Sequence, residues 1–122
     1  MAGFYEMNHK GKNILCLDIA DLKISDKPEL NRLVQEAKRN IRQQPPKSVL
    51  IITNVKETKF DTDIANTIKE YARHNTPYIK ASSLVGVSGW AKIILTAVKT
   101  VTGRDFHLAD TMDEAKEWLV GQ

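Results

Sequence analysis

The pattern of hydrophobic and polar positions along this chain predicts strands that alternate with helices. Apolar or alternating runs rich in β-branched and aromatic residues are typical of strands, whereas apolar residues three and four positions apart are typical of helices. Strands are expected within residues 4–8, 14–19, 48–54, 78–87 and 106–109. Apolar stripes at helical spacing occupy residues 30–41, 64–72, 90–101 and 115–119.

This order of elements predicts an α/β fold. The sequence of elements is β-β-α-β-α-β-α-β-α, and strands that are joined through helices pair in parallel through right-handed crossovers. The first two strands flank Lys10-Gly11, a dipeptide typical of a tight hairpin turn, so they are expected to pair antiparallel. We therefore expect a mixed, mostly parallel sheet with helices packed against it.

Individual positions within these elements allow sharper predictions. Trp90, Ile93 and Val101 belong to the apolar stripe of the third helix and are expected to face inward, and Gly103 is expected to end that helix. In the strand that begins near Tyr78, strict alternation would place Lys80 and Ser82 on one face and Ser83 on the other. These positions are polar within an otherwise apolar strand.

Length and composition indicate an ordinary globular protein. The 122 residues suffice for a single domain spanning 1–122, and the net charge of +3 lacks the dense basic stripe that nucleic-acid binders usually carry. No apolar run is long enough to cross a membrane, and the N-terminal residues do not resemble a signal peptide. The single cysteine, Cys16, cannot form a disulfide within the chain. We expect a cytoplasmic protein that binds neither nucleic acid nor membrane.

Several segments together resemble the STAS-like, SpoIIAA-like domain family, whose relatives include bacterial anti-sigma factor antagonists. The resemblance covers nearly the whole chain and is most similar to a branch of small bacterial proteins of unassigned function. It is carried by the segments ILCLDIADL, SVLIITNV, KFDTDIAN, KASSLVGVSGW, TGRD and DTMDEAKEWLV. The resemblance implies a sheet with packed helices and a role as a protein-interaction module.

The resemblance also points to Thr62. In the antagonists, a serine that follows an aspartate at the start of the second helix is phosphorylated, which switches the binding partner. This chain has Asp61-Thr62-Asp63-Ile64 where the antagonists have Asp-Ser-Ser-Gly, which makes Thr62 the candidate phospho-acceptor. The alternative interpretation is that Thr62 is the N-cap of the second helix, where its hydroxyl would accept a backbone N–H.

A second candidate site is the turn Gly86-Val87-Ser88-Gly89-Trp90. It follows a central strand and opens a helix, and the carboxyl edge of a parallel sheet together with a helix N-terminus favours a bound anion. The turn is neither a GxGxxG motif nor a Walker loop. The alternative interpretation is a tight strand-to-helix turn. In that case Trp90 would be an anchor for the core or for an interface.

No set of residues has the spacing of a catalytic or metal site. The histidines His9, His74 and His107 are far apart and match no zinc motif, and Ser88 lacks the second glycine of a nucleophile elbow. We therefore expect no metal, no cofactor and no enzymatic activity. The leading hypothesis is a regulatory or protein-interaction module that forms a homodimer, with Trp90 or Trp118 in the interface. The alternative is a binding domain for a small ligand, a nucleotide or other anion, that uses the Gly86–Gly89 turn.

Overall fold

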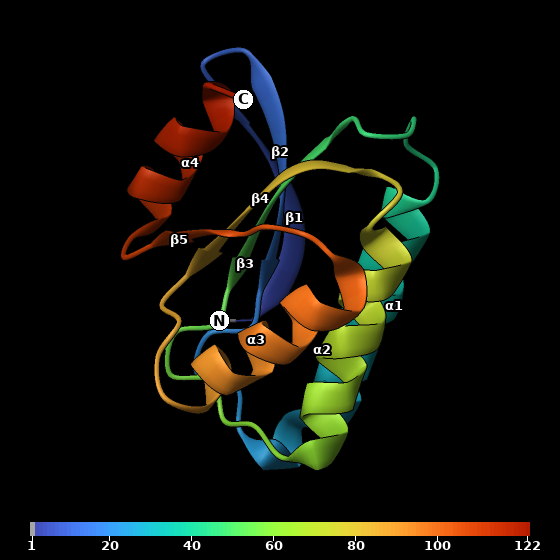
Figure 1. The fold of residues 1–122 in the computed structure, drawn as a ribbon, viewed down its shortest axis with the longest axis vertical. Coiled ribbons are helices and arrows are strands. Elements are labelled where there is room, and N and C mark those ends of the chain that lie inside the picture. Colours follow the sequence, from blue (N-terminus) through green and yellow to red (C-terminus); the bar gives the residue numbers. More distant parts are fainter. Residues whose placement is uncertain (1) are drawn as a thin grey trace.

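The computed structural model describes residues 2–122 and confirms the α/β prediction. Five strands form one mixed sheet in the order β1-β2-β3-β4-β5, with the first pair antiparallel and the others parallel (Figure 1). The strands are β1 (Gly3–His9), β2 (Lys12–Asp18), β3 (Val49–Asn54), β4 (Ile79–Val85) and β5 (His107–Ala109). The helices are η1 (Ile24–Asp26, one 3-10 turn), α1 (Lys27–Ile41), α2 (Thr62–Asn75), α3 (Trp90–Thr102) and α4 (Met112–Val120).

The helices cover the sheet from both sides. Helices α1, α2 and α3 lie on one face, while α4 lies on the other (Figure 1). Successive right-handed crossovers between neighbouring parallel strands place each connecting helix on the same face, which explains the grouping of α1 to α3. Helix α4 follows β5 and packs on the opposite face, where Ala115 and Leu119 join the second core.

The central strands β2 and β3 are buried on both faces, which agrees with the near-continuous apolar sequence of residues 48–54. In β2, Leu15 and Leu17 belong to the core under α1 and α2, while Ile14 and Cys16 belong to the core under α4. All residues of β3 except Asn54 are buried. Burial on both sides of β2 and β3 explains why these strands show no polar alternation.

The edges of the predicted elements are set by turn residues in the expected places. Lys10 and Gly11 both have positive φ, 51° and 81°, in the hairpin between β1 and β2. Two consecutive residues with positive φ are typical of the two-residue turn whose twist matches that of a hairpin. Gly103 has a φ of 67° and ends α3, which confirms its predicted role.

The prediction for Lys80 and Ser82 was wrong. Val49 pairs with Ile79 and Leu50 pairs with Ala81, so Lys80 is an extra residue in β4 and the alternation is interrupted there. The Lys80 ammonium donates a hydrogen bond to the Gln122 carbonyl oxygen (3.0 Å) beyond α4, whereas Ser82 faces α2 and α3. A bulge shifts every later side chain to the opposite face, and its position depends on the partner strand.

Candidate functional site

The outer groove is a hollow of about 390 Å³ between the first half of α2 and α3. It is lined by Phe60, Asp61, Thr62, Ala65, Asn66, Lys69, Trp90, Ile93, Ile94 and Ala97. It therefore brings together Thr62 and Trp90, which belong to the two candidate sites proposed from the sequence and are 28 positions apart. The groove has an apolar interior and carries charged side chains only on its α2 side.

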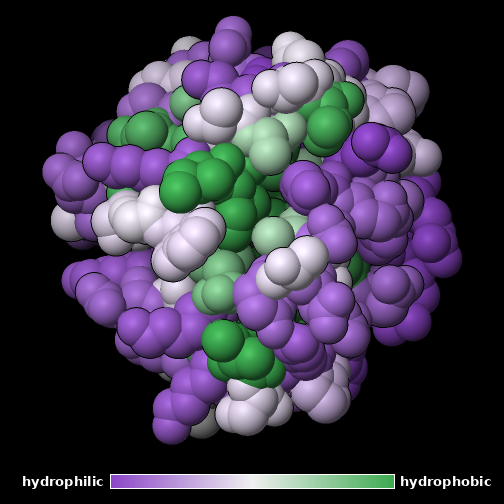
Figure 2. Space-filling model, turned by 60° about the horizontal axis from the view of Figure 1, so that its bottom comes forward, coloured by the Kyte–Doolittle hydropathy of each residue, from purple (hydrophilic) through white to green (hydrophobic). Residues whose placement is uncertain are grey.

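The outer groove is bordered by apolar side chains that the sequence pattern placed incorrectly. Trp90, Ile93 and Val101 were expected to face inward, but they are exposed by 69%, 61% and 43%. The buried positions of α3 are instead Ala91, Ile94 and Val98. We call Trp90, Ile93 and Val101 the α3 stripe. Figure 2, which turns the lower end of the molecule forward, shows hydrophobic surface gathered in a band with hydrophilic surface around it.

The physical reason for this error is that α3 has apolar residues around more than half of its circumference. Positions 90, 93 and 101 lie on one side of the helix, whereas 91, 94 and 98 lie roughly 90° away. Because α3 packs against α2 and one face of the sheet, one side of the helix is buried. Helical spacing alone shows how wide the apolar side of a helix is. It does not show which part of that side packs against a neighbouring element.

Thr62 occupies the first turn of α2 but does not cap it. The Asp61 carboxylate accepts the backbone N–H of Ile64 (2.9 Å), so Asp61 is the N-cap and the N-cap interpretation of Thr62 was wrong. The Lys27 ammonium contacts the carboxylates of Asp61 (2.5 Å) and Asp63 (3.2 Å). These contacts raise the pKa of Lys27, and hydrogen bonds from Lys27 and from the Ile64 N–H lower the pKa of Asp61. Thr62 is left exposed on the rim of the groove.

The two glycines of the Gly86–Trp90 turn, Gly86 and Gly89, have different structural roles. A Cβ atom on Gly86 would lie 2.6 Å from the Lys56 Cβ and 2.7 Å from the Lys56 Cα, so Gly86 permits two loops to pass closely. Gly89 is the N-cap of α3, where it offers no side-chain cap, and a Cβ there would meet nothing within 4 Å. Val87 packs against the core, and Ser88 is exposed. The turn therefore leads from the core to the first residues of α3, whose backbone N–H groups have no side-chain cap.

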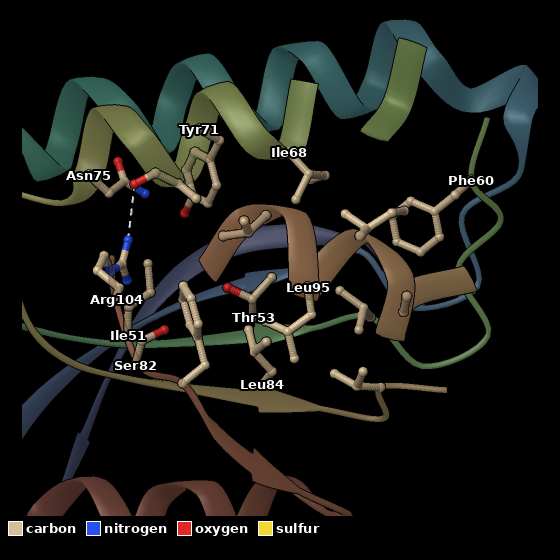
Figure 3. A pocket seen from close by; sticks show the side chains of 17 residues that line it. Ile51, Thr53, Phe60, Ile68, Tyr71, Asn75, Ser82, Leu84, Leu95 and Arg104 are labelled. Carbon is tan, nitrogen blue, oxygen red and sulfur yellow. Dashed lines mark hydrogen bonds between the residues drawn. The ribbon is translucent and has the colours of Figure 1, made fainter. Parts of the chain in front are cut away.

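A second hollow, the inner cavity, lies between the sheet and the two helices α2 and α3. Its volume is about 70 Å³, and most of its walls are apolar. Polar side chains gather at one end, where Tyr71 and Asn75 of α2 meet Arg104, which follows α3 (Figure 3). The Arg104 guanidinium donates to the Ala72 carbonyl oxygen (3.0 Å) and lies over the Phe106 ring (4.7 Å to its centroid).

Nothing in the local sequence indicated that Arg104 would be part of a site. It stands in the short polar segment between Gly103 and β5, where an arginine is ordinarily exposed. Tyr71 belongs to the expected apolar stripe of α2, and only the structure shows that its hydroxyl is buried without a hydrogen-bond partner in residues 2–122. Arg104 and Tyr71 come together because the chain leaving α3 turns back beneath α2.

The remaining polar residues that the sequence singled out have local structural contacts. The His107 Nδ1 atom and the Ser83 hydroxyl share a hydrogen bond (2.9 Å), and the His107 ring stacks on Trp118 (4.2 Å between ring centroids). Trp118 is thereby partly buried against the sheet, whereas Trp90 is exposed.

Across residues 2–122, no cluster of three or more His, Cys, Asp or Glu side chains could hold a metal ion. Within the same residues, no helix is long and apolar enough to cross a membrane.

The fold has a clear counterpart among solved structures. No protein-family model and no curated protein sequence matches this chain. The chain is similar in structure to an uncharacterized protein from the DUF3478 family with a SpoIIAA-like fold, from Shewanella loihica PV-4. The TM-score is 0.67 with 14% sequence identity, and the match covers 98% of this chain and 95% of the other. This protein therefore has a SpoIIAA-like fold, as its sequence resemblance implied, and identity this low shows the fold alone.

Proposed function

We propose that this chain is a non-enzymatic, regulatory protein-interaction module, and that its binding surface is the outer groove together with the α3 stripe. The observation that carries the proposal is the exposure of Trp90 and Ile93, by 69% and 61%, beside an apolar groove. Contiguous exposed apolar surface with a polar rim is typical of a protein-binding site. The fold is compatible with this role, because the relatives that the sequence resembles include anti-sigma factor antagonists.

The groove fits an amphipathic helix from a partner. It lies between two helices, its interior is apolar, and Lys69 and Asp61 on its α2 side supply charges of both signs. Helices dock in such grooves through apolar side chains at three- and four-residue spacing. In the α3 stripe of this chain, Trp90 and Ile93 are three positions apart and Val101 lies about two turns further along the same side. A second copy could therefore supply the helix, and the expected homodimer would be symmetric.

The one thiol of the chain is unsuited to nucleophilic catalysis, which supports the non-enzymatic part of the proposal. Cys16 is fully buried in β2, and burial raises the pKa of its thiol to about 11. A nucleophilic cysteine instead needs a lowered pKa and access to substrate.

The variant Ile93→Glu tests the surface. Ile93 is exposed, so the change should leave the fold intact while placing a charge in the proposed interface. Ile24→Glu is the matched control, because Ile24 is also an exposed isoleucine (45%) but lies in η1, outside the groove. Light scattering at increasing concentration should show dimers for the wild type and for Ile24→Glu, and monomers for Ile93→Glu. Dimers that persist in Ile93→Glu would contradict the groove as the dimer interface.

A second measurement addresses a regulatory partner. Affinity capture from an extract of the source organism, compared between the two variants, should recover a protein with Ile24→Glu that is lost with Ile93→Glu. Equal recovery by both variants would contradict binding at this surface.

Intact mass of the protein isolated from its own cells would show whether Thr62, on the rim of the same groove, carries a phosphate. Peptide mapping that places a phosphate elsewhere would contradict a switch at Thr62.

A further inference from the structure

The inner cavity contains an unmet hydrogen-bond donor. Tyr71 is only 5% exposed, and its hydroxyl has no hydrogen-bond partner among residues 2–122. Burial raises the pKa of this hydroxyl and the nearby Asn75 amide offsets only part of that rise, so the hydroxyl remains protonated and can donate at any physiological pH. Buried polar groups in native proteins are nearly always paired, and an exception calls for an explanation such as a bound water or ion.

The same end of the cavity contains a cation without a counter-ion. Within residues 2–122, Arg104 forms no ion pair, and its guanidinium is held by the Ala72 carbonyl oxygen and the Phe106 ring. Burial lowers the pKa of Arg104 to about 10, so the side chain is still charged at neutral pH. A guanidinium has five N–H donors, and most of those on Arg104 are therefore available.

Figure 3 shows how these groups lie. The Tyr71 hydroxyl and the Asn75 amide come from α2, and the Arg104 guanidinium comes from the segment after α3. All three groups gather at one end of the cavity. Ser82 of β4 is also near this end, whereas Leu84, Leu95 and Ile68 line the middle and Phe60 lies at the far end (Figure 3). The cavity is thus polar and positively charged at one end and apolar along the rest of its length.

We propose that the inner cavity is a binding site for a short-chain carboxylate, with the carboxylate held by Arg104 and Tyr71 and the alkyl chain lying against Leu84 and Leu95. A carboxylate accepts hydrogen bonds at two oxygens and neutralises the guanidinium. The apolar walls favour an alkyl acid over inorganic phosphate, which would leave its outer oxygens without donors. This site shares only Phe60 and Ile94 with the lining of the outer groove, and the proposal does not depend on the proposed function.

The volume sets the size of the ligand. A cavity of about 150 Å³ can hold benzene, and the inner cavity has about 70 Å³. In proportion to the six carbon atoms of benzene, roughly three non-hydrogen atoms are enclosed, so acetate and propionate, with four and five, are the largest alkyl acids that this partly open cavity could take. For a ligand of this size, efficient binding gives a dissociation constant of roughly 10 μM to 1 mM.

The experiment is a titration of the ¹⁵N-labelled full chain with sodium propionate, followed by NMR at constant ionic strength. We expect saturable shifts of the backbone amides of Tyr71 and Asn75 and of the Arg104 side-chain Nε–H. Propionamide, which has the same shape without the charge, should bind at least about tenfold more weakly, as should inorganic phosphate. An absence of saturable shifts with propionate, or equal affinity for propionamide, would overturn the proposal.

Two variants separate binding from a merely structural role. Tyr71→Phe removes only the unpaired hydroxyl, so the ligand-free protein should melt at the same temperature or a few degrees higher, while propionate affinity falls about tenfold. Tyr78→Phe is the control, because Tyr78 lies outside the cavity lining, and it should leave affinity unchanged. Arg104→Met should abolish the preference for propionate over propionamide. Unchanged affinity in Tyr71→Phe would overturn the role of Tyr71 as a ligand donor, and an unchanged preference in Arg104→Met would overturn that of Arg104.

Discussion

Replacing Gly86 with alanine tests why the turn before α3 needs a glycine. The added Cβ would lie 2.6 Å from the Lys56 Cβ and 2.7 Å from its Cα, far closer than the roughly 3.5–4.0 Å at which carbon atoms pack. Lys56 cannot move freely, because its carbonyl oxygen accepts the Asp21 N–H (3.0 Å) and its N–H donates to Asn54 Oδ1 (3.2 Å). We therefore expect a large loss of stability from Gly86→Ala.

The expected loss of stability in Gly86→Ala has two contributions. Gly86 has a φ of 78°, and this left-handed conformation costs an alanine about 1–2 kcal/mol. Overpacking against a fixed neighbour adds about 1–3 kcal/mol, which gives about 2–5 kcal/mol in total. Gly103→Ala is the matched control, since Gly103 has a similar φ of 67° but a Cβ there would meet no atom within 4 Å, so only the first cost applies.

Urea unfolding followed by circular dichroism would measure both variants. With a slope of about 2 kcal/mol per molar urea, the Gly86→Ala midpoint should fall by about 1–2.5 M, and the Gly103→Ala midpoint by clearly less. Equal losses in the two variants would refute the argument that contact with Lys56 excludes a side chain. In that case the positive φ alone would explain why position 86 needs a glycine.

Asp61 and Cys16 allow further tests. Thr62→Ala should change the free energy of unfolding by less than about 0.5 kcal/mol, whereas Asp61→Ala should lower stability clearly, because Asp61 caps α2 and pairs with Lys27. The pKa of Asp61 is lowered in the folded state, so its contribution is present above the ordinary aspartate pKa of 3.8 and is lost as the pH falls through the folded value. Thermal melts of wild type and Asp61→Asn should thus differ at pH 7 and converge at low pH; a constant difference would contradict the ion pair. Cys16, with its pKa of about 11, should react with a thiol reagent at pH 8 only as fast as the protein opens, and rapid labelling of native protein would contradict its burial.

The candidate site was only partly predictable from the sequence. The turn at Gly86–Trp90 was identified from a local pattern and Thr62 from the family resemblance, and the structure brings Thr62 and Trp90 into one groove. The outward direction of Trp90 was missed, because an apolar arc on a helix does not reveal which side finds a neighbour. The inner cavity was also missed, since it depends on a hydroxyl that lacks a partner and on an arginine that folds back beneath α2.

Four features follow from the amino-acid sequence alone: the order of the elements, the hairpin at Lys10-Gly11, the burial of β3 on both faces and the end of α3 at Gly103. They arise from interactions among neighbouring residues, such as backbone conformation, capping and apolar periodicity, so they can be read locally. Three others are properties of the folded chain: the bulge at Lys80, the exposure of the α3 stripe and the meeting of Tyr71 with Arg104. Each of these depends on packing between segments distant in the sequence, which no local pattern encodes.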